Sequence, residues 1–123
     1  MGWYDDYRKI DFDKRNILND KIKYLEATSA EISKLVKIVY QDATAAKTAN
    51  LNIINSKKIS SYPKIRDILV DADFSVLDSP WKFDTILKVA KEDIESQIIA
   101  LKIERKEINE MTKDKKRKWK GWV

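Results

Sequence analysis

Apolar residues recur at every seventh position between residue 11 and about residue 58. One row consists of Leu18, Leu25, Ile32, Val39, Ala46 and Ile53, and three further residues fall four positions after members of it: Ile22, Val36 and Ala43. This spacing is typical of the apolar seam of a coiled coil. No proline precedes Pro63 and no glycine lies between Gly2 and Gly121, and these residue types interrupt helices most strongly. The pattern therefore predicts one long helix over residues 11–58, whose apolar stripe needs a partner.

A second row with the same period follows Pro80. It consists of Leu87, Ile94, Leu101 and Ile108. The pair Ser79-Pro80 is a favourable helix start, because serine caps the first amide groups and proline suits the first helical position. We expect a helix over residues 80–116 that packs antiparallel against the first helix. The same heptads would also serve an exchanged dimer, in which the partner helix comes from a second copy.

The connecting segment, residues 59–79, holds both prolines. The residue before a proline is pushed out of the helical region, so the first helix should end before Pro63. Pro63 can then open a short helix that runs to about Ala72. The predicted fold class is all-α: two long antiparallel helices, forming a coiled-coil-like helical hairpin, with a short helix in the connecting segment. We expect a single helical domain over residues 1–123.

The C-terminal helix carries a second, smaller apolar face. Val89, Ile99 and Ile103 project away from the seam when the residues are placed at about 100° intervals. A two-helix hairpin leaves this face in water. We therefore expect Val89, Ile99 and Ile103 to form a face through which the protein oligomerises.

Composition argues against catalysis. The chain has no cysteine and no histidine, which removes thiolate nucleophiles, imidazole bases and the usual zinc ligands. Asp71, Asp73 and Asp78 resemble fragments of a calcium loop but lack its glycine and terminal glutamate. We expect no enzyme activity, no cofactor and no metal site.

The last eleven residues form a basic and aromatic tail. Residues 113–120 contain six basic groups and one acidic group, so this stretch carries the whole net charge of +5. The residues of the tail that we predict to contact a partner are Lys113, Lys115, Lys116, Arg117, Lys118, Trp119, Lys120 and Trp122. Tryptophans can anchor such a segment in a groove of a protein partner. The tail could also bind nucleic acid, because lysines neutralise phosphates and tryptophans stack on unpaired bases.

Two further interpretations of the tail remain open. In a closed hairpin the chain ends meet, and Trp3, Tyr4 and Tyr7 would then lie beside the tail as an intramolecular clasp. An anionic membrane surface could also bind lysine and tryptophan. Among contacts with other molecules we favour a protein partner, keep nucleic acid as the alternative, and do not expect a membrane partner; the intramolecular clasp stays open beside them.

The sequence thus predicts a non-enzymatic assembly or adaptor subunit that self-associates or docks on a protein partner. The alternative is an accessory nucleic-acid-binding protein that uses the lysine and tryptophan tail. Lysine outnumbers arginine by 20 to 5 and there are 16 isoleucines, a composition that suggests an AT-rich genome, such as a phage or other mobile element of a low-GC bacterium. No apolar run is long enough to span a membrane and no signal-peptide pattern opens the chain. We therefore expect a cytoplasmic protein, or a virion protein if a phage encodes it.

Overall fold

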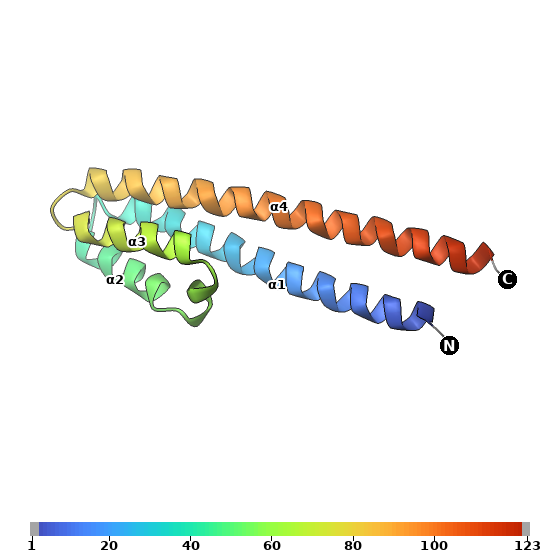
Figure 1. The fold of residues 1–123 in the computed structure, drawn as a ribbon. Coiled ribbons are helices and arrows are strands. Elements are labelled where there is room, and N and C mark those ends of the chain that lie inside the picture. Colours follow the sequence, from blue (N-terminus) through green and yellow to red (C-terminus); the bar gives the residue numbers. More distant parts are fainter. Residues whose placement is uncertain (1–2, 122–123) are drawn as a thin grey trace. The chain divides into compact units, whose positions relative to one another are not determined.

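The computed structural model describes the backbone of residues 3–121 and the side chains of residues 9–113. Within these residues the fold is all-α, with α1 (Trp3–Ile38), α2 (Ala43–Ile54), a 3-10 helix η1 (Lys57–Ser61), α3 (Pro63–Ser75) and α4 (Pro80–Gly121). The long helices α1 and α4 pack against each other in antiparallel orientation, with the shorter helices between them in the sequence (Figure 1). The predicted fold class is confirmed.

The chain divides into two compact units. Unit 1 consists of Met1–Tyr24 and Gln97–Val123, and unit 2 consists of Leu25–Ser96. Both α1 and α4 contribute to each unit. Unit 2 therefore contains the C-terminal part of α1, all of α2, η1 and α3, and the N-terminal part of α4.

Unit 2 has a continuous apolar core. Helix α2 packs on α3, and α3 packs on η1. The side chains that are fully excluded from solvent include Leu25, Ile32, Ala46, Ile65, Leu69, Ala72, Val76, Phe83, Leu87, Ala90 and Ile94. This core contains most members of the two predicted seven-residue rows that fall in unit 2. The rows therefore predict the helix pairing, because their residues are the ones that the pairing buries.

The prediction of a single helix over residues 11–58 is wrong, because α1 begins at Trp3 rather than at residue 11 and the helix is interrupted between Ile38 and Ala43. The carbonyl of Ile38 accepts from both Gln41 and Asp42 over 2.8 Å, which closes a turn. Asp42 is extended, with φ −151° and ψ 90°, and its Oδ1 accepts a hydrogen bond from the amide of Ala45 over 3.0 Å. A capping aspartate therefore starts α2, although neither proline nor glycine is present.

The helix starts expected at Pro63 and after Ser79 agree with the structure. Pro63 is the first residue of α3, as predicted. The Ser79 hydroxyl caps α4 by accepting from the amide of Lys82 over 3.2 Å. The backbone of α4 is helical as far as Gly121 rather than to residue 116, so it extends through most of the segment that we expected to form a tail.

Candidate interaction surfaces

Three large apolar side chains are exposed where α3 is followed by α4, at the turn drawn in yellow in Figure 1. Phe74 is 78% exposed, Leu77 is 58% exposed and Trp81 is 70% exposed. Their neighbours Val76 and Phe83 are fully buried. The turn is therefore anchored in the core of unit 2 while these three side chains lie in solvent. We call Phe74, Leu77 and Trp81 the turn patch.

Two backbone hydrogen bonds of Ser79 connect this turn to the helices on either side. The amide of Ser79 donates to the carbonyl of Ser75 over 2.8 Å, and the carbonyl of Ser79 accepts from the amide of Phe83 over 3.1 Å. Together with the serine cap, these bonds fix the end of α3 and the first turn of α4. The position of Trp81, the second residue of α4, is therefore set by the backbone.

Charged side chains border the turn patch. Asp71 precedes Phe74 by one helical turn, Asp78 lies in the connection, and Lys82 follows Trp81; all three charged side chains are exposed. An apolar centre with a charged rim is the usual composition of a protein interaction surface. The two seven-residue rows do not reveal this surface, because its residues lie in the connecting segment and at the first turn of the second helix, outside both rows.

Polar side chains connect α2 to α3. Lys47 Nζ lies 2.9 Å from Asp73 Oδ2 and 3.3 Å from the carbonyl oxygen of Asp73. Asn50 is fully buried, and its Nδ2 donates to the carbonyl of Leu69 over 2.9 Å. Asn50 Oδ1 has no hydrogen-bond partner among the described residues. These contacts specify the register of α2 on α3, because a shift would leave more buried polar groups unpaired.

A second polar contact joins the turn that follows α1 to α4. The hydroxyl of Tyr40 donates to Asp84 Oδ2 over 2.7 Å, and Lys88 Nζ lies 3.3 Å from Asp84 Oδ1. Asp84 is buried. The hydrogen bond to Asp84 raises the pKa of Tyr40 above its ordinary value, with smaller contributions from burial and from the negative charge of Asp84.

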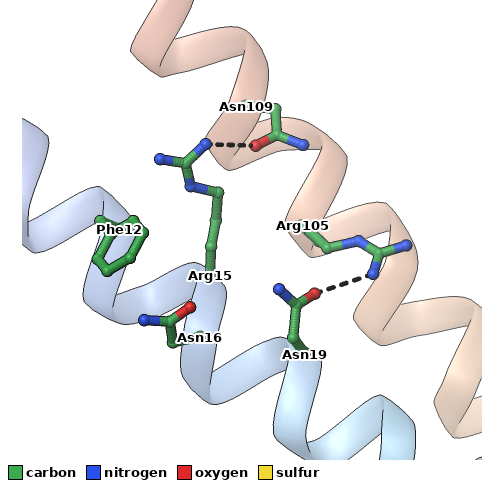
Figure 2. A pocket seen from close by; sticks show the side chains of 6 residues that line it. All are labelled: Phe12, Arg15, Asn16, Asn19, Arg105 and Asn109. Atoms are coloured by element: carbon green, nitrogen blue, oxygen red, sulfur yellow. Dashed lines mark hydrogen bonds between the residues drawn. The ribbon is translucent and has the colours of Figure 1, made fainter.

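A polar groove lies between α1 and α4 within unit 1 (Figure 2). Its volume is about 390 Å³, and its lining residues are Phe12, Arg15, Asn16, Asn19, Arg105 and Asn109. Arg15 Nη1 donates to Asn109 Oδ1 over 3.2 Å, and Arg105 Nη1 donates to Asn19 Oδ1 over 2.9 Å. Each helix thus supplies one arginine and one asparagine to a reciprocal pair of cross-helix hydrogen bonds.

The reciprocal pair follows from a short repeat. Both helices contain arginine, two intervening residues, leucine or isoleucine, and asparagine: residues 15–19 in α1 and residues 105–109 in α4. In antiparallel helices the two copies run in opposite directions, so each arginine meets the asparagine of the other copy. One further bond, from Thr112 Oγ1 to Asp11 Oδ2 over 2.8 Å, continues the same pairing toward the chain ends. None of the residues that line the groove is acidic, so its two guanidinium groups give it a positive charge.

The structure describes only some of the side chains that the sequence analysis singled out. Lys113 is exposed, whereas Lys115, Lys116, Arg117, Lys118, Trp119, Lys120 and Trp122 lie outside the described side chains, as do Trp3, Tyr4 and Tyr7. The expected oligomer face is in solvent: Val89 is 51% exposed, Ile99 is 60% exposed and Ile103 is 54% exposed. Val89 belongs to unit 2, and the two isoleucines belong to unit 1.

Over the residues that the structure describes, no group of three or more acidic side chains could hold a metal ion. No helix in that part of the chain is long and apolar enough to cross a membrane. Comparison of the chain with protein-family models, with curated proteins and with solved structures gives no match.

Proposed function

We propose that the protein is a non-enzymatic assembly or adaptor subunit that self-associates or docks on a protein partner through its exposed helical surface. The turn patch is the observation that carries this proposal. Three large apolar side chains that are exposed within eight residues of the sequence, beside neighbours that are buried, favour an interaction site. Two of the three are aromatic, and aromatic anchors provide much of the binding energy at protein interfaces.

The turn patch is also well suited to binding because its backbone is hydrogen-bonded and its neighbours are packed in the core. Val76 and Phe83 are fully buried, and the hydrogen bonds of Ser79 fix the turn. A partner therefore does not have to order the loop when it binds, which lowers the entropic cost of association. Full burial of Phe74 and Trp81 would contribute roughly 1.5–3 kcal/mol for each side chain before that cost.

Helix α4 offers a second surface. Ile99 and Ile103 are one helical turn apart, and both are more than half exposed. An apolar pair at this spacing forms a stripe on one side of a helix, which another helix can cover. We therefore assign the contact, with a second copy or with a protein partner, first to the turn patch, and we keep Val89, Ile99 and Ile103, the oligomer face predicted from the sequence, as the second candidate surface. Docking by the basic tail stays a prediction from the sequence.

The solution mass tests this proposal. Light scattering across a wide concentration range, at low and at high salt, should give a mass above the 14.4 kDa of one chain. Because the contact is apolar, the association should persist at high salt. The ratio of absorbance at 260 and 280 nm on the same peak should be that of protein alone. A monomer at every concentration would count against self-association, and a mass that falls with added salt would count against an apolar contact.

A further inference from the structure

We infer that unit 1 carries a binding site for single-stranded nucleic acid, centred on Arg15 and Arg105 in the groove of Figure 2. This inference goes beyond the proposed function and does not rest on it. It also differs from binding by the basic tail, because every residue that it uses lies before the tail or at its first lysine.

The basic residues that form this site lie along one side of each helix of unit 1. One stripe on α1 consists of Phe12, Arg15, Asn16, Asn19 and Lys23, and one stripe on α4 consists of Lys102, Arg105, Lys106, Asn109 and Lys113. The two stripes have identical spacing, with members three, four, seven and eleven residues after the first, so each stripe lies along one side of its helix. The groove joins them.

These two stripes carry six basic residues and no acidic residue. The acidic residues in the described part of unit 1 all lie off the stripes: Asp11, Asp13, Asp20, Glu104, Glu107 and Glu110. Among them, Asp11 is buried against Thr112. Unit 1 therefore presents one cationic face, and such a face attracts a polyanion and releases its counterions on binding.

The two arginines are positioned for oxyanions. Each guanidinium donates one hydrogen bond from Nη1 to an asparagine across the groove, which holds the side chain in place between the helices (Figure 2). A guanidinium has five N–H donors, so most of them remain for a ligand. The planar fork of arginine matches two oxygens of one phosphate. Two phosphates of a strand could thus be bound without further ordering of these side chains.

An aromatic ring beside the arginines points to nucleic acid rather than to an acidic peptide. Phe12 lines the groove and is 56% exposed. Single-strand binding sites combine a basic groove with aromatic rings on which unpaired bases stack. The exposed amide of Asn16 lies one helical turn further along the same stripe and can bond to a base edge. An acidic peptide would satisfy both arginines but would leave Phe12 without a partner.

Fluorescence anisotropy with a labelled oligothymidylate of about 15 nucleotides tests the site, since sites of this kind span roughly 4–16 nucleotides. The full chain should bind at low salt, with an affinity that falls as salt is added. The double variant Arg15→Gln/Arg105→Gln should lose at least about tenfold in affinity. Its salt dependence should be shallower by roughly 1.4 in the logarithmic slope, which corresponds to two phosphates of a single strand. Phe12→Leu should lose about fivefold or more with an unchanged slope.

The matched control removes the same charge elsewhere on α1. Lys14 and Lys21 are exposed and belong to neither stripe, so Lys14→Gln/Lys21→Gln should change the affinity by less than about threefold and leave the slope unchanged. Helicity by circular dichroism checks that each variant is folded. If Arg15→Gln/Arg105→Gln is not folded, Arg15→Lys/Arg105→Lys replaces it. That variant keeps the charge but loses the fork, so its affinity should fall with an unchanged slope.

Three results would overturn the site. The first is an absence of binding at low salt. The second is an equal loss in the arginine variant and in the Lys14→Gln/Lys21→Gln control, which would assign binding to the tail or to overall charge. The third is competition by polyglutamate as strong as by unlabelled oligothymidylate, with no effect of Phe12→Leu, which would assign the face to an acidic protein.

Discussion

Tyr40 donates a hydrogen bond to Asp84 across 2.7 Å, and this bond links the break after α1 to the start of α4 within unit 2. The bond raises the pKa of Tyr40 above its ordinary value of 10.0. A group with a raised pKa in the folded state stabilises the fold at any pH below its unfolded value. The contribution of Tyr40 is therefore complete below about pH 10 and is lost as the pH rises through the raised pKa.

Replacement of Tyr40 by phenylalanine tests this linkage. Tyr40→Phe should lower the thermal midpoint at neutral pH, because Asp84 loses a hydrogen-bond donor and stays buried. Thermal unfolding of both proteins from neutral to strongly alkaline pH should show their midpoints converging above pH 10, since the wild type then loses the bond too. Midpoints that stay parallel over the whole range would contradict the account.

Asn50 should be intolerant of charge. Asn50→Asp places a carboxylate at a fully buried position. In the wild type, Asn50 Nδ2 donates a hydrogen bond to the carbonyl of Leu69, and the substitution removes this donor. An unpaired buried charge of this kind costs about 3 kcal/mol or more of the free energy of unfolding. Asn52→Asp is the control, because Asn52 is an exposed residue of the same helix and should change that free energy by less than about 0.5 kcal/mol. Urea unfolding monitored by circular dichroism measures both, and similar values for the two variants would be inconsistent with this core.

Ile94 should be essential for unit 2. It is fully buried on α4, and Ile94→Asp should cost more than about 4 kcal/mol, a large part of the stability of a small domain. Ile99→Asp makes the same change five residues later at a position that is 60% exposed. Circular dichroism should show a large loss of helix in the first variant and nearly full helicity in the second. Full helicity in Ile94→Asp would refute the packing of α4 in this core.

The helix pairing could be predicted because burial and periodicity agree along the chain. Leu25, Ile32, Leu87 and Ile94 are all fully buried, and Ser79 caps α4 as its position before Pro80 suggests. The break after Ile38 could not be predicted from the same pattern. Val39 and Ala46 lie on either side of α2's start, seven residues apart, and both are buried, so the row continues across a break in the helix. The only local signal was Asp42, a residue type that also occurs within helices.

The candidate surfaces were less visible in the sequence than the core. Arg15 and Arg105 are each the first residue of the same five-residue repeat. The sequence does not show that the two copies pair, because the pairing depends on the register of α1 against α4. Phe74 and Trp81 lie on either side of a helix boundary, so helical periodicity does not relate them. Their exposure follows from the turn at Ser79, which is a feature of tertiary structure.

The most direct test of the assembly proposal is the solution mass of Phe74→Ser/Trp81→Ser beside that of the wild type, by light scattering at matched concentrations. Both residues are exposed, so the variant should keep its helicity. We predict that the wild type has a mass above the 14.4 kDa of one chain and that the variant has the mass of a monomer. A folded variant with the same mass as the wild type would contradict the assignment of the turn patch as the contact surface.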